Sequence, residues 1–67
     1  MKNKKNYTLK SLRAKKGLRQ KDLAKVLNIS ASTYSSKENG ERRFTIEEAI
    51  AIADFFNQDI REIFLTS

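Results

Sequence analysis

The sequence predicts an all-α domain, a compact bundle of five short helices in a chain of 67 residues. Apolar residues recur at the three- and four-residue spacing of a helix, and the two-residue alternation of a strand is absent. The chain contains no proline, the residue that most strongly breaks a helix. Residues that tolerate a positive φ at a helix end separate the periodic segments. These separators are Gly17, Asn28, Gly40 and Asn57.

The first two helices are expected over residues 8–16 and 20–27. Each segment has an apolar stripe at helical spacing, and each is followed by one of the separators. Both are rich in Leu, Ala and Lys, which are good helix formers. The two stripes consist of Leu9 and Leu12, and of Leu23, Ala24 and Leu27.

The third helix is expected over residues 31–38, within the hydroxyl-rich stretch ISASTYSSKENGE. Ser30 is placed to cap its N-terminus. Because only a few residues around Asn28 separate it from the preceding helix, the two helices are expected to form a tight helix-turn-helix. Its hydroxyl side chains are short, and each can donate a hydrogen bond to a partner or accept one; the alternative is that they are simply tolerated on a solvated face.

The last two helices are expected over residues 46–56 and 60–65. Thr45-x-x-Glu48 forms a capping box before the first of them, and Asp59-x-x-Glu62 resembles one before the second. Apolar residues at helical spacing are expected to face the core. They are Ile46, Ala49, Ile50, Ala53 and Phe56 in the first helix, and Ile60 and Ile63 in the second.

Charge is distributed unevenly along the chain, whose net charge is +6. Residues 1–43 contain 13 Lys and Arg against three acidic residues, a net charge of +10. Residues 44–67 contain one Arg against five acidic residues, a net charge of −4. This segregation favours a polyanionic partner on one side of the molecule. The alternative is that the lysines simply form a solvated surface.

Composition argues against several functional classes. The chain has no Cys and no His, which removes thiolate nucleophiles, disulfides and the usual ligands of a zinc site. Hydroxyl side chains are present without an activating base, so we expect no enzyme, no metal and no cofactor. No apolar run approaches the roughly 20 residues of a membrane span, and the apolar stripes are needed for the core, which disfavours a membrane-surface peptide. A cytoplasmic protein is expected.

The segments LRAKKGLRQKDLAKVLNIS, TYSSKENGERR, FTIEEAIAIADFF and DIREIF follow one another in order within a stretch that runs from about Leu9 to Leu65. In this arrangement the chain resembles the helix-turn-helix regulators of the phage lambda repressor and Cro type. It looks most like small phage-related and mobile-element regulators with TYSxKExG and FTxxEA patterns. The resemblance implies a lambda-repressor-like five-helix fold over residues 7–67, whose second helix crosses the DNA backbone and whose third enters the major groove. Residues 1–6 are expected to be a flexible basic arm.

The resemblance also implies roles for individual residues. Positions that reach base edges in the family are occupied here by Ala31, Ser32 and Ser36. Arg13 and Glu38 match a pair that ties the first helix to the end of the recognition helix. Contacts with the DNA backbone are expected from Arg19, Gln20, Ser30, Thr33, Asn39, Arg42 and Arg43.

Three positions depart from the family pattern, and one aromatic residue allows two interpretations. Arg19 replaces the usual Ser or Thr cap, so either that helix end frays or Arg19 contacts a phosphate. Lys37 stands where many members have an apolar residue, so its stem is expected on the core with the ammonium group outside. Ala31 replaces Gln, and its methyl group can touch thymine but cannot read adenine, so specificity would lean on DNA shape. Tyr34 is expected to pack on the second helix with its hydroxyl at the edge; the alternative is a phosphate contact.

Together these features predict a sequence-specific, double-stranded DNA-binding transcriptional regulator, a repressor that binds a palindromic operator as a homodimer. The alternative is a DNA-binding antitoxin or a protein-interaction module of a toxin–antitoxin pair. No small-molecule ligand is expected. Apolar residues left over from the core predict a two-fold interface in the acidic half of the chain. It is expected to comprise Phe55, Phe64 and Leu65, with Arg61 and Gln58 at its rim.

Overall fold

The computed structural model describes residues 7–64, and all the regular elements in this range are α-helices. The predicted all-α class is therefore confirmed, and each described helix end lies within one residue of its expected position. The predicted arm at residues 1–6 and the last three residues lie outside the described range. In chain order the helices are α1 (Tyr7–Lys15), α2 (Gln20–Leu27), α3 (Ala31–Glu38), α4 (Ile46–Phe56) and α5 (Ile60–Phe64).

Each predicted separator adopts a left-handed backbone conformation. The φ angles are 69° at Gly17, 60° at Asn28, 86° at Gly40 and 55° at Asn57. At the end of α2 this conformation turns the chain so that the N–H of Ile29 bonds to the carbonyl of Ala24 at 3.0 Å. Such bonds satisfy carbonyl groups that the end of a helix would otherwise leave without partners.

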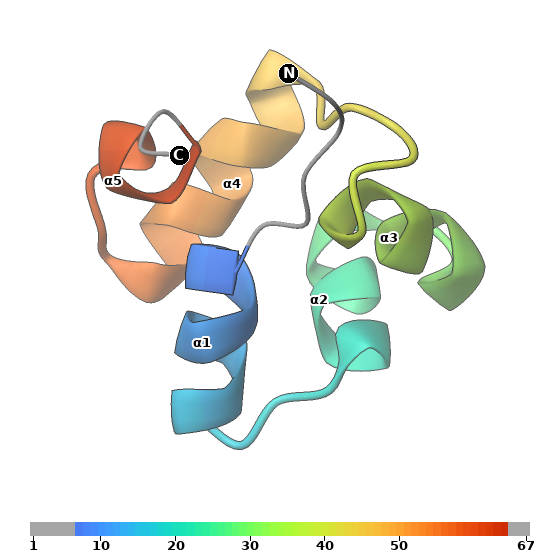
Figure 1. Ribbon diagram of the computed structural model, residues 1–67, viewed down its shortest axis with the longest axis horizontal. Helices are drawn as coiled ribbons and strands as arrows, with labels where there is room; N and C mark the ends of the chain where they lie inside the picture. The colour runs from blue at the N-terminus through green and yellow to red at the C-terminus, as the bar shows by residue number, and fades with distance from the viewer. Residues whose placement is uncertain (1–6, 65–67) are drawn as a thin grey trace.

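The helices pack around one core, with α4 and α5 on one side of the molecule and α2 and α3 on the other (Figure 1). Helix α2 lies against both α3 and α4, and α5 lies against α1 and α4. Every described helix contributes to the buried cluster, which consists of Leu9, Leu23, Ala24, Tyr34, Ile52, Ala53, Phe56 and Ile63. No helix within residues 7–64 is long and apolar enough to cross a membrane.

The buried stripe of α4 is rotated relative to the one expected. Ala49, Ala53 and Phe56 are buried as predicted, but Ile46 is 76% exposed and Ile50 is 48% exposed. Ile52 is fully buried in their place. The set at positions 49, 52, 53 and 56 has the same helical periodicity as the expected set, and its centre lies about 50° further round the helix. The prediction was therefore wrong for both isoleucines.

A chain of aromatic side chains fixes the connection between α3 and α4. The ring of Phe44 packs edge-on against Tyr34 at 5.9 Å between ring centroids, and against Phe64 at 5.3 Å. Phe44 therefore anchors the connecting segment to α3 on one side and to α5 on the other. Edge-to-face pairs of this kind stabilise a fold slightly beyond the area that they bury.

Candidate nucleic-acid interface

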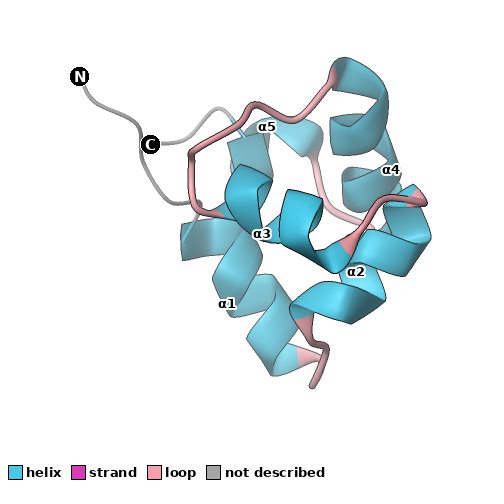
Figure 2. Ribbon diagram, turned by 90° about the vertical axis from the view of Figure 1, so that its right-hand side faces the viewer, coloured by secondary structure: helices cyan, strands magenta, loops and turns pink. Residues whose placement is uncertain are grey.

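Helix α3 lies at the surface beside α2, on the side of the molecule away from α5 (Figure 2). One face of α3 is committed to the core, because Tyr34 and Glu38, one helical turn apart, are both fully buried. Ser32 and Ser36 are also one turn apart, about 160° round the helix from that buried pair. Ser32 is exposed and Ser36 is half-buried, and Ala31 is exposed in the first turn. The structure thus places Ser32 and Ser36 on the outer side of α3, whereas Ala31 is exposed at the start of the helix, about 100° round from Ser32.

Two hydroxyl groups organise the start of α3. The Oγ of Ser30 accepts a hydrogen bond from the backbone N–H of Thr33 at 3.0 Å. The Ser30 hydroxyl in turn donates to Oγ1 of Thr33 at 2.9 Å. Ser30 is therefore the N-cap of α3, as predicted. Because Ser30 uses its own proton in this pair, the hydroxyl proton of Thr33 remains available to an external acceptor such as a phosphate oxygen.

The other end of α3 is held by a buried carboxylate with four hydrogen bonds. Arg13 of α1 donates from Nε to Oε2 of Glu38 and from Nη2 to Oε1, both at 3.0 Å. Tyr34 donates its hydroxyl to Oε2 at 2.9 Å, and Gln20 of α2 donates its amide to Oε1 at 2.9 Å. Arg13 also donates to the carbonyl of Leu18 at 3.1 Å. The expected Arg13–Glu38 pair is thus part of a network that joins α1, α2 and α3.

The network shifts the pKa of each ionisable member. Burial alone would raise the pKa of Glu38, but the hydrogen bonds from Arg13, Gln20 and Tyr34 outweigh it, so its pKa lies below the usual value. Burial and the neighbouring carboxylate raise the pKa of Tyr34. The bond to Glu38 raises the pKa of Arg13 despite partial burial. Arg13 and Glu38 are therefore held in their charged forms and Tyr34 in its neutral form.

Two residues of this network differ from expectation. The Tyr34 hydroxyl was expected at the molecular edge, or at a phosphate, but it is buried against Glu38. Gln20 was expected at a phosphate, and one of its amide protons is already bonded to Glu38. The second amide proton and the carbonyl oxygen of Gln20 could still bond to another group, so its phosphate contact stays a prediction. The Gln20 bond has no local signal, because Gln20 is 18 residues from Glu38 in sequence. Tyr34 and Glu38 are four residues apart on one helix, a spacing that could have indicated their contact.

Arg19 occupies the N-cap position of α2 with an extended backbone, and its side chain makes no cap bond. A guanidinium group carries only donors, so it cannot accept from the first N–H groups of the helix. Half of a capping box remains, because the carboxylate of Asp22 accepts from the backbone N–H of Arg19 at 2.8 Å. The exposed guanidinium of Arg19 is thus free of the cap, at the end of α2 that the resemblance places against the DNA backbone.

The segment after α3 presents two arginines. The backbone N–H groups of Glu41 and Arg42 both bond to the carbonyl of Ser36, at 2.8 and 3.2 Å. Asn39 donates its side-chain amide to Oγ of Ser35 at 3.3 Å, so it lies against the last turn of α3. Arg42 and Arg43 are exposed, and no hydrogen bond to another group within residues 7–64 holds either guanidinium.

Lys37 behaves differently from its expectation. Its side chain is only 10% exposed, and its Nζ lies 2.6 Å from Oε1 of Glu48 in α4. The stem lies inward as predicted, but the ammonium group turns to α4 instead of to solvent. Burial alone would raise the pKa of Glu48, whereas the hydrogen bonds from Lys37 and Thr45 lower it below the usual value.

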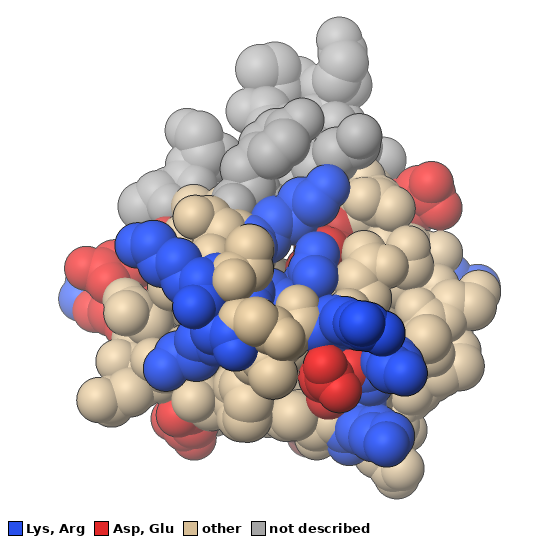
Figure 3. Space-filling model, turned by 90° about the horizontal axis from the view of Figure 1, so that it is seen from below, with Lys and Arg blue, Asp and Glu red and all other residues tan. Residues whose placement is uncertain are grey.

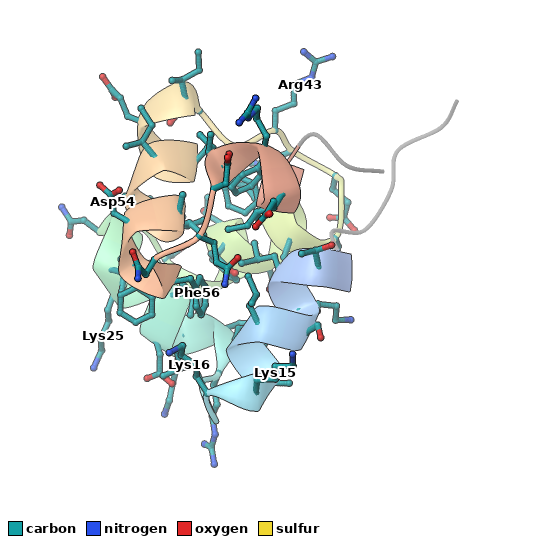
Figure 4. The ribbon with its side chains drawn as sticks, turned by 90° about the vertical axis from the view of Figure 1, so that its left-hand side faces the viewer. Lys15, Lys16, Lys25, Arg43, Asp54 and Phe56 are labelled. Atoms are coloured by element: carbon teal, nitrogen blue, oxygen red, sulfur yellow. The ribbon has the colours of Figure 1, made fainter. Side chains whose placement is uncertain are left out.

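Basic side chains lie at both ends of the molecule, with α3 between them. Figure 3 shows Lys and Arg gathered over much of the lower face, where α1 ends and α2 begins. Figure 4 shows Arg43 extending from the opposite end to Lys15, Lys16 and Lys25, whereas Asp54 projects from α4 at another edge. Figure 3 also shows Asp and Glu on the lower face, so the charge segregation in the sequence is only partly a segregation in space. Within residues 7–64, no cluster of His, Cys, Asp or Glu could hold a metal ion.

The described residues of the predicted two-fold interface differ in their exposure. Phe55 is 44% exposed, and its ring packs edge-on against Phe56 at 5.1 Å between centroids. Arg61 is exposed and pairs with Asp59 at 3.0 Å. Phe64 is half-buried and its ring packs against Phe44, so less of its surface is available to a second copy than expected. Leu65 lies outside the described residues.

Comparison with known proteins agrees with this geometry. A family model for helix-turn-helix proteins matches residues 9–63. The chain is 42% identical over 65 residues to an uncharacterized HTH-type transcriptional regulator of Methanocaldococcus jannaschii, covering 97% of this chain and 92% of that protein.

Two solved structures have the same fold. The restriction-modification controller protein C.AhdI from Aeromonas hydrophila is 30% identical, with a TM-score of 0.71 over 84% of this chain and 81% of that one. The clp gene regulator ClgR from C. glutamicum also has a TM-score of 0.71, over 85% of this chain and 74% of that one, and at 23% identity it supports the fold alone. The chain therefore belongs to the helix-turn-helix family of DNA-binding transcriptional regulators of the phage lambda repressor and Cro type.

Proposed function

We propose that this regulator is a repressor that binds a palindromic operator as a homodimer and blocks access of the polymerase by occupying the site. The observation that carries the proposal is the placement of α3. Its outer face presents short polar side chains, and exposed basic side chains that bond to no other group within residues 7–64 lie on either side of it. The protein of Methanocaldococcus jannaschii is named a transcriptional regulator and C.AhdI a controller protein, and neither of the two is named as an antitoxin.

Contacts with DNA divide into reading and positioning. Ser32 and Ser36 are proposed to contact base edges in the major groove, with Ala31 adding an apolar contact. Backbone contacts are proposed from Arg19, Gln20, Ser30 and Thr33 at the α2–α3 side, and from Asn39, Arg42 and Arg43 after α3. The two groups flank α3, as the phosphates of the two strands flank a major groove.

The size of the domain supports a pair of copies. Its principal extents are 29 × 24 × 22 Å, and it carries one recognition helix. Successive major grooves on one side of a duplex lie about 34–36 Å apart, so a single copy cannot place α3 in both. A second copy related by a two-fold axis could do so, and a palindromic site would match that symmetry.

The proposed interface lies on the acidic side of the molecule. It centres on Phe55, with Arg61 at its rim and with Phe64 and Leu65 near the end of the chain. Figure 1 places α5 far from α3, so pairing there would leave both recognition helices free for DNA. The described apolar area is small, which predicts a weak dimer in solution that is completed on the operator.

Selection of duplexes from a random pool, followed by sequencing, tests the proposal. A palindromic consensus is expected, with affinity that falls steeply with salt, by about 0.9 log units for each phosphate contact per log unit of salt. Replacing Arg43 with Ala should weaken binding to all sequences alike and flatten this slope by about one unit. Affinity indifferent to salt, or selection without any consensus, would contradict the proposal.

A further inference from the structure

The segment from Asn39 to Thr45 carries Arg42 and Arg43 between two helices, so its geometry decides where their guanidinium groups lie. At its first end the segment is folded onto α3 by the two bonds to the carbonyl of Ser36. At its other end Thr45 caps α4. The N–H of Glu48 donates to Oγ1 of Thr45 at 3.0 Å, and Oε1 of Glu48 accepts from the N–H of Thr45 at 2.9 Å.

Lys37 joins these two ends directly. Its Nζ reaches the same oxygen of Glu48 that accepts from Thr45, at 2.6 Å. The side chains are 10% and 16% exposed, so the pair is much better shielded than the Arg61–Asp59 pair at the surface. Each charge also lies at the favourable end of its own helix, since Lys37 is in the last turn of α3 and Glu48 is in the first turn of α4.

We propose that Lys37 and Glu48 are positioning residues that close the segment 39–45 and hold Arg42 and Arg43 in place for the phosphates, without touching DNA themselves. This rests on the proposed phosphate contacts of the two arginines. The Lys37 ammonium group is already bonded to a carboxylate and shielded by protein, so it is not a further phosphate ligand. Restricting the loop before binding reduces the conformational entropy that is lost when the arginines engage the duplex.

The substitution Glu48→Gln distinguishes this role from simple electrostatics. An amide oxygen can still accept from the N–H of Thr45, so the capping box is retained while the ion pair is lost. Removing an acidic charge should by itself tighten binding to a polyanion. A positioning role predicts the opposite sign, a loss of roughly 3- to 10-fold in affinity, as for groups coupled in one network. Glu47→Gln is the matched control. Glu47 is exposed in the same turn of α4, and its substitution removes the same charge.

A comparison of the Glu48→Gln effect with and without the two arginines distinguishes a positioning role from a general effect on stability. The variants are compared by salt-titrated binding to the selected duplex, at a temperature where circular dichroism shows each one folded. The loss from Glu48→Gln should shrink to nothing in an Arg42→Ala/Arg43→Ala background. Lys37→Met is the second variant, and combining it with Glu48→Gln should cost no more than Lys37→Met alone.

The proposal is overturned if Glu48→Gln binds as Glu47→Gln does, or if its loss persists at full size without the arginines. If Glu48→Gln does not fold, the same comparison is made with Lys37→Met, and an undiminished loss in the arginine-free background overturns the proposal equally. If the wild-type chain has no salt-dependent affinity for any duplex, the proposed function itself is contradicted.

Discussion

Glu38 is the residue on which the geometry of the interface depends most. It is fully buried, and its two oxygens take four hydrogen bonds from three side chains, so neither its charge nor its bonding capacity is left unsatisfied. A buried carboxylate with this many donors favours one arrangement of its partners, because losing any of them leaves a charge in the interior. Since the donors come from α1, α2 and α3, Glu38 fixes the angle at which α3 is presented.

Replacing Glu38 with Gln should lower the free energy of unfolding by about 1–3 kcal/mol, as for the loss of hydrogen bonds to a charged group. The amide brings donors of its own against Arg13, Gln20 and Tyr34, so part of the network is broken. DNA affinity should fall as well, although no contact with DNA is removed. Glu41→Gln is the control, because Glu41 is exposed beside the same helix end and should change stability by less than about 0.5 kcal/mol.

The contribution of Glu38 should also depend on pH in a defined direction. Its folded-state pKa lies below the ordinary value of 4.5, so the stabilisation is complete above about pH 4.5 and is lost as the pH falls through the folded-state pKa. The difference in unfolding free energy between wild type and Glu38→Gln should therefore shrink in acid. Urea unfolding at a series of pH values measures it, and a difference that stays constant down to about pH 3 would show that Glu38 does not titrate in this way.

Base reading is expected to reside in two small side chains. Changing Ser32 or Ser36 to Gln should alter the preferred operator, because a longer amide reaches different base edges. The fold should be kept in the variant of the exposed Ser32, since exposed substitutions usually cost under about 0.5 kcal/mol. Because Ser36 is half-buried, circular dichroism first checks that its variant is folded. Random-pool selection with each variant gives the answer, and Ser11→Gln on the exposed side of α1 is the control. Identical consensus sequences in all variants would place the reading face elsewhere.

At the scale of the elements, the start of α2 has an exposed cation where a capping side chain would otherwise stand. Thr45 caps α4 with both halves of a capping box, and Ser30 caps α3 through its hydroxyl. Arg19 gives α2 only the reverse bond from Asp22 and leaves the first N–H groups of the helix without a side-chain acceptor from the cap. A helix that starts this way is less stable than a capped one, and the exposed guanidinium at that place is suited to a phosphate.

Arg19→Thr should therefore move stability and affinity in opposite directions. A threonine hydroxyl completes the capping box with Asp22 and should raise the free energy of unfolding by about 0.5–1 kcal/mol. DNA affinity should fall, and the salt dependence should flatten by about one unit, because a phosphate contact is lost. Lys21→Ala removes the same charge without adding a cap, so it should not gain stability. Unchanged salt dependence in Arg19→Thr would mean that Arg19 does not reach a phosphate.

Across the whole molecule, the two signs of charge come mostly from different helices, and the exposed apolar residues do not form one patch. The basic half of the chain surrounds α3, and the acidic half forms α4 and α5. Four large apolar residues are exposed within residues 7–64, namely Val26, Ile46, Ile50 and Phe55. Ile46 and Phe55 lie about 180° apart around α4, so they cannot belong to one small contact patch.

Phe55→Glu should give a folded monomer that binds a half-site poorly and the full operator without cooperativity. A charge at this position opposes burial against a second copy, and the residue is too exposed for the change to unfold the core. Analytical ultracentrifugation and operator titration measure the two effects. Ile46→Glu is the matched control on the opposite side of α4 and should leave pairing intact. If Ile46→Glu disrupts pairing and Phe55→Glu does not, the dimer surface lies on the other face of α4.

Where each helix begins and ends was determined by the sequence alone. Helix ends depend on the conformational preferences of single residues and on bonds within a few positions, as at Asn28 and Ser30. The outer face of α3 follows equally directly, because 3.6 residues per turn place Ser32 and Ser36 together once Tyr34 is inside. These features are local, so they could be predicted without knowing what packs against them.

Only the tertiary structure decided which stripe of α4 is buried and which partners the polar side chains take. Eight of the eleven residues of α4 are apolar, so several stripes satisfy helical periodicity, and packing against α2 and α5 selects the one through Ile52. The bonds from Gln20 to Glu38 and from Lys37 to Glu48 join residues 18 and 11 positions apart. Such partnerships depend on how whole helices lie against one another, and no spacing along the chain encodes that arrangement.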